Sequence, residues 1–211
     1  MTAGEASLPP GDPLDLLDWR RRVFLLYAEV RASPDPQMAW RRWRTVRDKL
    51  FRGHPQSPLQ EASRVGAKLR YFDYDPAYRV TGALRAVEPQ HFEVGNSDGT
   101  TSGFTRFGEV AFELPDGPAS LELYWLEGYG GGVFLPFRDL TRGAETYAAG
   151  RYLLDTVKGA DLGADDGRLV LDFNFAFNPS CSYDSRWACP LAPPPNWLEV
   201  PVRAGELAPG K

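Results

Sequence analysis

The period of the hydrophobic residues changes once along this chain, and that change limits the folds the chain can adopt. From Leu14 to about Phe51, apolar residues recur at a helical spacing of about 3.6 residues, and from Ala67 onward the period shortens to about 2. The short period is clearest between Glu109 and Leu114, where every second residue is large and apolar. A helical beginning followed by a long β region is therefore predicted.

Two helices are expected at the N-terminal end. The first covers Pro13 to Val30, and the prolines between Ser33 and Pro36 interrupt its pattern. Because proline suits the first position of a helix, the second helix is predicted from Pro36 to Phe51. The expected organisation is a disordered tail over residues 1–13, a helical region over residues 14–58 and an antiparallel β domain over residues 59–211.

The β region divides into roughly nine short predicted strands, spaced by roughly 8 to 15 residues. They include stretches at Leu69–Tyr74, Arg168–Phe177 and Leu198–Val202, and turns rich in Gly, Pro, Asn and Asp separate them, as at Asn96–Gly99. No helices of crossover length lie between the strands, so their pairing should be antiparallel. The predicted fold is mainly β: a curved antiparallel sheet that forms a half-barrel, barrel or sandwich, with two N-terminal helices.

Charge and hydropathy exclude several classes of partner. The formal net charge of −4 argues against general affinity for nucleic acid, which requires a cationic field. A basic cluster between Arg41 and Lys49 is expected to form a solvated helix face. No apolar stretch approaches the ~20 residues of a transmembrane helix, and the N-terminus lacks the order of a signal peptide. A cytoplasmic protein that binds no membrane is therefore expected, with no oligomeric state indicated.

The segment from Leu169 to Asn178 carries the most specific polar pattern. Read as an extended strand, it has one apolar face consisting of Leu169, Leu171, Phe173, Phe175 and Phe177. The opposite face would carry the polar residues Asp172, Asn174 and Asn178. Asp and Asn are depleted in strands, so their alternation suggests side chains selected for hydrogen bonding. The pattern predicts either one wall of a polar, semi-enclosed pocket or an ordinary solvated face.

A second polar segment begins at Phe137. Asp139 and Thr141 predict a turn held by hydrogen bonds from the backbone to side chains. On the functional interpretation, four nearby side chains form the rim of the pocket, because arginine can bind a carboxylate or phosphate through two hydrogen bonds. These four candidates are Arg138, Glu145, Tyr147 and Arg151, and Tyr183 is a further rim candidate from the third segment.

The two cysteines, Cys181 and Cys189, lie eight positions apart. Both histidines, His54 and His91, are far away in sequence, so the spacing supports neither a zinc site nor a cysteine nucleophile with a histidine base. Two buried thiols or a disulfide remain as alternatives. Motifs for nucleotide cofactors, P-loops, serine hydrolases and zinc proteases are missing from the sequence, so neither a cofactor nor a metal is expected.

Several motifs occur in a fixed order after about Trp40. They are Tyr71-Phe72-x-Tyr74-Asp75-Pro76, Phe137-Arg138-Asp139-x-Thr141, Asp172-Phe173-Asn174, Asn178-Pro179-x-Cys181-x-Tyr183, Cys189-Pro190-Leu191-x-Pro193-Pro194-x-Asn196 and Ala204-Gly205-Glu206. In these motifs the chain resembles the family called Domain of Unknown Function 1684. The resemblance implies a β-rich domain of about this size and supplies no activity. One position departs from the family pattern, because Phe177 stands where members typically have tyrosine.

Three functions follow as hypotheses. The first is a domain that binds a small polar or anionic molecule in a pocket lined by Asp172, Asn174 and Asn178. The second is a hydrolase or lyase without a cofactor, in which Asp172 or Glu145 acts as general acid or base. The third is a structural or interaction protein whose polar motifs form an internal hydrogen-bond network. A flavin in a split-barrel cleft is a further alternative that rests on fold analogy alone.

Overall fold

The two helices begin at the prolines that predict them. The structure is a computed structural model, and it describes residues 11–210. Helix α1 (Pro13–Ala32) is capped by Asp12, whose side chain accepts a hydrogen bond from Leu14 N (2.8 Å), and α2 (Pro36–Gly53) is capped in the same way by Asp35. Each helix extends two residues beyond its predicted end. Most of the predicted tail, residues 1–10, lies outside the described residues.

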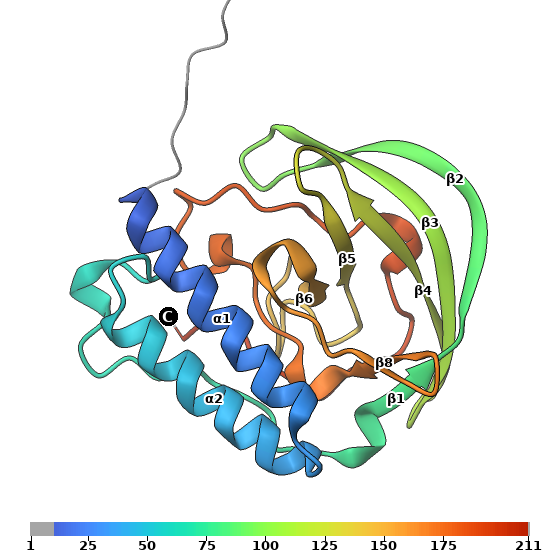
Figure 1. Ribbon diagram of the computed structural model, residues 1–211, viewed down its shortest axis with the longest axis horizontal. Coiled ribbons are helices and arrows are strands. Elements are labelled where there is room, and N and C mark those ends of the chain that lie inside the picture. The colour runs from blue at the N-terminus through green and yellow to red at the C-terminus, as the bar shows by residue number, and fades with distance from the viewer. Residues whose placement is uncertain (1–10, 211) are drawn as a thin grey trace, which may run out of the picture.

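Within residues 11–210, eight antiparallel strands form two open sheets (Figure 1). The strands are β1 (Arg79–Gly82), β2 (Leu84–Gly95), β3 (Thr101–Leu114), β4 (Gly117–Leu126), β5 (Gly132–Phe137), β6 (Arg151–Asp155), β7 (Ala164–Asp165) and β8 (Arg168–Asp172). The five-stranded sheet has the order β2-β3-β4-β5-β6, and the three-stranded sheet has the order β1-β8-β7. The larger sheet curves strongly and leaves β2 and β6 as its edges, so the mainly β fold with a curved antiparallel sheet and two helices is confirmed.

Two stretches among the roughly nine predicted strands are not strands in the structure. The stretch Leu69–Tyr74 is not a strand, because Tyr71 makes only an isolated bridge to Glu206. The stretch Leu198–Val202 also fails to form a strand, and Pro201 within it has no N–H to give to a ladder.

Strand β8 ends at Asp172, and the prediction of an extended segment as far as Asn178 is wrong. Residues Phe173–Phe175 form a 3₁₀ helix, η4, because the Asp172 side chain turns back and accepts a hydrogen bond from the backbone N–H of Asn174 (3.1 Å). Strand β1 cannot pair with residues beyond Asp172, because Asp172 already lies opposite Arg79, the first residue of β1. The chain before β1 turns through Pro76, which has no N–H to donate to a sheet. The polar and apolar residues of this segment therefore do not occupy two opposite faces.

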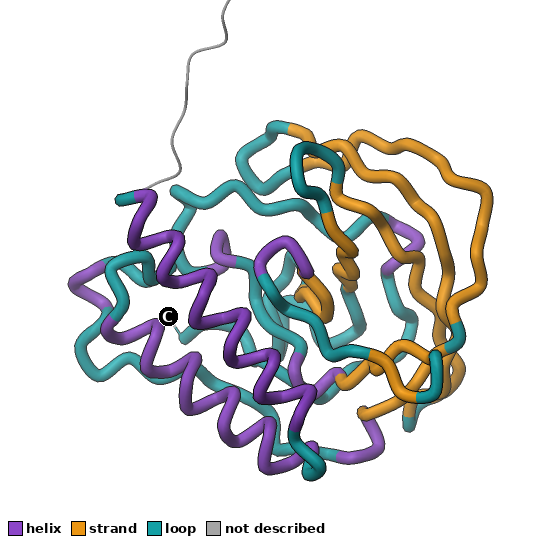
Figure 2. The backbone as a smooth tube through the Cα atoms, in the orientation of Figure 1, coloured by secondary structure: helices purple, strands orange, loops and turns teal. Residues whose placement is uncertain are grey.

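The helices lie side by side and cover one side of the molecule, while the curved sheet encloses the opposite side (Figures 1 and 2). Trp43 of α2 is fully buried and packs edge-on against Phe175 of η4, with ring centroids 5.3 Å apart. The Trp40 indole N–H donates to the backbone oxygen of Asn174 (3.0 Å). The largest hydrophobic core therefore joins the helices to the turn that follows β8.

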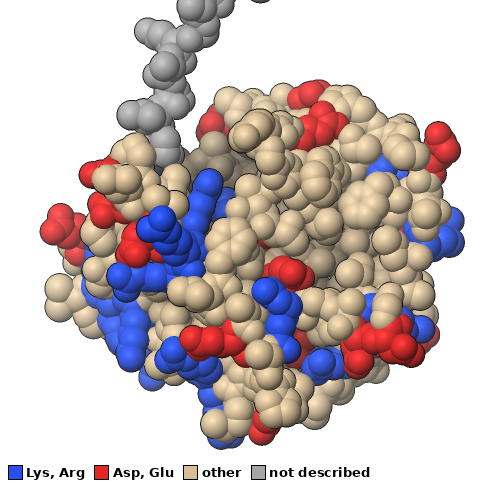
Figure 3. Space-filling model, viewed as in Figure 1, with Lys and Arg blue, Asp and Glu red and all other residues tan. Residues whose placement is uncertain are grey.

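The basic cluster of α2 occupies three different environments. Lys and Arg side chains gather over the two helices (Figure 3), and Arg41 and Lys49 are exposed as predicted for a solvated face. Arg44 instead stacks over the ring of Trp40, with its guanidinium 4.4 Å from the ring centroid. Arg47 enters the interior and pairs with Glu206 (2.6 Å). The prediction of one solvated face therefore fails for these two arginines.

Candidate functional site

The predicted site residues do not surround one pocket. Asp172, Asn178 and Tyr183 line three different cavities. Asn174 is fully buried, and its side-chain amide makes two hydrogen bonds to the backbone of Asp75. It accepts from the Asp75 N–H (3.0 Å) and donates to the Asp75 carbonyl (2.8 Å). The pocket inferred from period-2 alternation is therefore not formed, because the strand on which it depends ends at Asp172.

Arg151 is a structural residue. It is 1% exposed, and its Nη2 pairs with Asp139 Oδ2 at 2.9 Å and donates to the Val202 carbonyl at 2.9 Å. Its Nη1 donates to the carbonyl of Ala204. The other Asp139 oxygen accepts from the backbone and hydroxyl of Thr141, which forms the turn predicted there. This buried pair attaches the C-terminal segment to the sheet.

Asn178 and Tyr183 belong to a second buried network, centred on Glu206. The Glu206 side chain is fully buried; its Oε1 accepts from Arg47, and its Oε2 accepts from the backbone N–H of Asn178 (2.6 Å) and from the Tyr183 hydroxyl (3.3 Å). The Asn178 amide also donates to the Leu207 carbonyl (2.8 Å). These hydrogen bonds connect α2, the loop after η4 and the C-terminal segment, while Asn178 Oδ1 has no partner within residues 11–210.

The remaining rim candidates lie near the surface. Glu145 pairs with Arg203 (3.2 Å), and both side chains are more than one-third exposed, at 38% and 56%. Arg138 donates to the Ala148 carbonyl (3.1 Å). Tyr147 lies beside Cys181, with its hydroxyl 4.0 Å from the sulfur. None of these contacts directs the side chain toward Asp172, so the predicted rim is not assembled.

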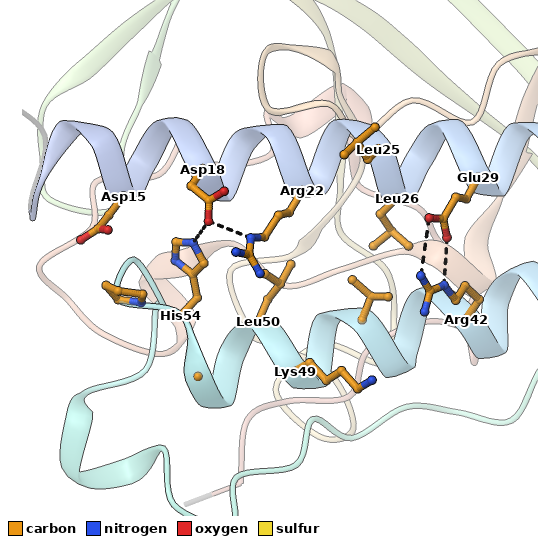
Figure 4. A pocket seen from close by; sticks show the side chains of 13 residues that line it. Asp15, Asp18, Arg22, Leu25, Leu26, Glu29, Arg42, Lys49, Leu50 and His54 are labelled. Carbon is orange, nitrogen blue, oxygen red and sulfur yellow. Dashed lines mark hydrogen bonds and ion pairs between the residues drawn. The ribbon is translucent and has the colours of Figure 1, made fainter.

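One cavity is a groove of about 580 Å³ between α1 and α2 (Figure 4). Four of its charged side chains form two ion pairs: Asp18 pairs with Arg22 (2.7 Å), and Glu29 pairs with Arg42 (2.8 Å). His54 also points at Asp18 (3.1 Å), but its Nδ1 already accepts from the backbone N–H of residue 56 (3.0 Å). Both ring nitrogens of His54 are therefore in contact with groups of the fold.

A second cavity, of about 570 Å³, lies between the curved sheet and the proline-rich segment Leu191–Pro195. Its walls include Phe92 and Val94, and the Arg106–Glu122 ion pair (2.9 Å) supplies polar groups. Glu122 also accepts from the Tyr124 hydroxyl. The polar groups of this cavity form hydrogen bonds and ion pairs with one another, so the cavity presents mainly an apolar surface.

The third cavity, of about 390 Å³, differs from these two because a buried carboxyl group lines it. We call it the Asp172 cleft; it lies between the α1–α2 connection and the three-stranded sheet. Its polar lining consists of Arg31, Ser33, Arg79, Asp165 and Asp172. The Asp172 side chain is 2% exposed, whereas Arg79 at the opening is 31% exposed. The cleft therefore brings two arginines and a desolvated carboxyl group to one place.

Only one oxygen of Asp172 is used by the fold. Oδ1 accepts from the backbone N–H (3.1 Å) and the side-chain amide (2.8 Å) of Asn174. Oδ2 has no hydrogen-bond partner among residues 11–210, and Arg79 Nε lies 3.8 Å away, which is too far for a hydrogen bond. A buried carboxylate oxygen without a partner is costly, which makes Asp172 a candidate site residue.

Burial sets the protonation of Asp172. Desolvation raises the pKa of its carboxyl group from 3.8 to about 6, and the hydrogen bonds from Asn174 and the charge of Arg79 offset only part of this rise. A rise of this size corresponds to roughly 3 kcal/mol, since one pKa unit is worth about 1.36 kcal/mol. The ionised carboxylate therefore destabilises the fold near neutral pH, which is typical of functional groups.

The pH dependence of stability provides a first prediction. Because the pKa of Asp172 is raised on folding, the native state holds its proton more tightly than the unfolded chain, and stability falls as the pH rises from 3.8 to about 6. Wild type should lose roughly 3 kcal/mol relative to Asp172→Asn over this interval. Urea denaturation of both proteins at a series of pH values measures the difference, and parallel curves would contradict a raised pKa.

The sequence pattern points to Asp172 but not to the residues around it. Arg79 follows the Asp75-Pro76 motif by a few positions, and Arg31 and Ser33 end the first helix, so all three are distant from Asp172 in sequence. The local signal was the spacing of Asp172 and Asn174, which is typical of a side-chain-stabilised turn as well as of a strand. Within the described part of the chain, no cluster of His, Cys, Asp and Glu could hold a metal ion, and neither helix could span a membrane.

The model of a family described as "Protein of unknown function (DUF1684)" matches residues 67–207, which include Arg79 and Asp172. A similar solved structure is that of an uncharacterized protein of Haloarcula marismortui, determined in solution by NMR. It shares 34% identity, covers 78% of this chain and 89% of that one, and gives a TM-score of 0.58. No curated protein matches the chain. Arg31 and Ser33 precede the matched residues, so the helical side of the cleft lies outside the family match.

Proposed function

The chain belongs to the DUF1684 family, which has no described function, and from the geometry of the Asp172 cleft we propose that it binds a small polar molecule there. The ligand presents a hydrogen-bond donor to Asp172 Oδ2 and an anionic group to Arg79 and Arg31. Short hydroxy acids and amino acids carry both groups. The observation that carries this proposal is the buried Asp172 oxygen without a partner.

The size and charge of the cleft support this ligand class. A volume of about 390 Å³ lies within the range of about 300–1,000 Å³ found for small-molecule sites. Arg31 Nη1 donates to the Asp161 carbonyl (2.7 Å) and lies 3.4 Å from the Asp161 carboxylate, and these contacts orient its guanidinium. Arg79 is 3.8 Å from Asp172, so a ligand that bonds both would replace a weak internal contact with two hydrogen bonds.

Ligand binding should raise the melting temperature of the wild-type protein. A panel of short hydroxy acids and amino acids at millimolar concentration supplies the probes, and differential scanning fluorimetry measures the shift. A ligand present at 100 times its Kd stabilises the native state by about 2.7 kcal/mol. Asp172→Asn and Arg79→Met should abolish most of the shift caused by a compound that stabilises wild type.

Arg85→Met is the matched control, because Arg85 is an exposed arginine paired with Glu109 on the other sheet. This variant should retain the full shift. A compound that stabilises wild type, Asp172→Asn and Arg79→Met equally would bind elsewhere and contradict a site in the cleft. Stabilisation of none of the proteins by the whole panel would contradict the ligand class.

Acid–base catalysis at Asp172 is a second candidate, favoured by the same carboxyl group. A pKa of about 6 lets Asp172 exchange a proton near neutral pH, as a general acid or base must. Glu145, the other carboxyl considered from the sequence, is half-exposed and paired with Arg203, so Asp172 is the stronger candidate. Conversion of a bound hydroxy acid that disappears in Asp172→Asn, with a pH profile that changes near 6, would distinguish catalysis from binding.

A further inference from the structure

The two cysteines, eight positions apart in sequence, meet in space. Cys181 lies in the 3₁₀ helix η5 (Ser180–Ser182), and its backbone N–H donates to the sulfur of Cys189 at 3.4 Å. Both are free thiols. Cys181 is partly exposed, whereas Cys189 is 3% exposed. One thiol is therefore accessible to a small reagent, and the second lies directly behind it.

We propose that Cys181 and Cys189 form a peroxide-reactive pair, in which Cys181 attacks a small hydroperoxide and Cys189 converts the product into a reversible disulfide. This site is separate from the Asp172 cleft and does not depend on a ligand there. The chemistry requires an accessible thiolate, a second thiol within reach and a group that assists the leaving oxygen.

The surroundings of Cys181 favour its thiolate without a histidine. A hydrogen bond from the Cys189 thiol is the main cause that lowers the pKa of Cys181 to about 6, and it outweighs the opposing effect of burial. The same contact, together with burial, raises the pKa of Cys189, which keeps that thiol protonated. The pair therefore has one ionised and one neutral member at neutral pH.

Tyr147 is placed to assist the first step. Its hydroxyl lies 4.0 Å from the Cys181 sulfur, and burial is the main cause that raises its pKa to about 12. The phenol therefore stays neutral at physiological pH and can donate a hydrogen bond to the oxygen that leaves. Tyr147 acts here as a hydrogen-bond donor to the peroxide, a role different from the pocket rim expected from the sequence.

The reaction balances in two steps. The Cys181 thiolate attacks one peroxide oxygen; an S–O bond forms, the O–O bond breaks, and the departing alkoxide or hydroxide takes up a proton. The sulfur is now a sulfenic acid, and the peroxide has been reduced to an alcohol or water. The Cys189 sulfur then attacks the Cys181 sulfur; an S–S bond forms, the S–O bond breaks, and the leaving hydroxide takes the Cys189 proton to give water. A dithiol restores both thiols by exchange.

Cys189 is held firmly for the second step. Its carbonyl accepts from the Ser97 N–H (2.9 Å), and its own N–H donates to the Ser97 hydroxyl (3.1 Å), which fixes it to the β2–β3 turn. The hydroxyl of Tyr152 donates a hydrogen bond to the carbonyl of Pro190, the residue that follows Cys189. The resolving thiol therefore stays beside Cys181 while the first step proceeds.

Intact-mass spectrometry of the full-length protein tests the proposal, with stoichiometric hydrogen peroxide as the probe. Wild type should lose two hydrogen atoms and gain no oxygen, and dithiothreitol should reverse the change. Cys189→Ser should instead gain one oxygen, which dimedone traps at Cys181. Cys181→Ser should consume peroxide more than about tenfold more slowly. The wild-type rate should be half-maximal near pH 6, rather than near the value of about 8.5 for an ordinary thiol.

Three results would overturn the proposal. The first is a wild-type mass that peroxide leaves unchanged although both thiols alkylate after denaturation. The second is a dimedone adduct on Cys189, and the third is equal oxidation of Cys181→Ser and wild type. The mass change and pH profile of wild type require no variant, so they remain decisive if a serine substitution impairs folding. Tyr147→Phe should slow the first step several-fold without changing the final disulfide.

Discussion

Arg151→Met is expected to lower the free energy of unfolding by roughly 3–5 kcal/mol, measured by urea denaturation at neutral pH. Methionine fills much of the volume of arginine but leaves Asp139, whose side chain is 2% exposed, as a buried charge without its cation. The carbonyls of Val202 and Ala204 also lose their donor. Because Arg151 attaches the C-terminal segment, hydrogen exchange of residues 202–206 should accelerate in the same variant.

The matched control for this variant is Arg203→Met. Arg203 pairs with Glu145 at 3.2 Å, close to the 2.9 Å of the Arg151–Asp139 pair, but its side chain is 56% exposed. Water screens such a pair, so the loss should be only about 0–1 kcal/mol. Equal losses in the two variants would show that burial does not determine the strength of the Arg151 pair.

Glu206→Gln should also destabilise the protein by roughly 3–5 kcal/mol in the same assay. Glutamine preserves the shape of the side chain but replaces one acceptor oxygen with an N–H₂ donor. That donor would face either the Arg47 guanidinium or the Asn178 N–H, and both of these are donors themselves. Either orientation leaves an unsatisfied buried group at the junction of α2 and the C-terminus.

Glu29→Gln provides the comparison for Glu206→Gln. Glu29 also pairs with an arginine of α2, Arg42 at 2.8 Å, but both side chains are about half exposed, at 51% and 53%. The expected loss is about 0–1 kcal/mol. If Glu206→Gln were equally mild, the polar network around Glu206 would contribute little to stability.

Local signals in the sequence predict the elements that local chemistry determines. Pro13 and Pro36 start the two helices because proline suits the first helical turn, and the capping Asp12 and Asp35 precede them. The turn beginning at Asn96 joins β2 to β3, as its Asn, Asp and Gly predict. These features depend on contacts between residues a few positions apart, so they can be recognised without the fold.

The buried networks could not be predicted in the same way. Glu206 lies 159 positions from Arg47, and no period in the sequence indicates that the two side chains meet. Arg151 and Glu206 also carry charge, which ordinarily marks a surface position. Only the fold shows that they are buried with partners. In the fold, Arg151, Asn178 and Tyr183 belong to these buried networks and do not line one shared pocket.

The polar pattern that points to Asp172 in the sequence is only partly right about its surroundings. The alternation with Asn174 suggested one polar strand face, but the two residues form a turn in which Asn174 occupies a single Asp172 oxygen. The other oxygen is left without a hydrogen-bond partner within residues 11–210. The site proposed for Asp172 therefore depends on how β8 ends. The alternation of polar and apolar residues along the sequence does not predict where a strand ends.

The titration of the Asp172 carboxyl carbon, followed by NMR in selectively labelled protein, tests the proposed site most directly. The signal, assigned by its disappearance in Asp172→Asn, should titrate with a midpoint of about 6, because the carboxyl group is buried and only one of its oxygens is hydrogen-bonded. A stabilising hydroxy acid or amino acid should displace this midpoint. A midpoint near 3.8 that such a compound leaves unchanged would show a solvated or internally paired carboxylate and contradict a ligand site in the cleft.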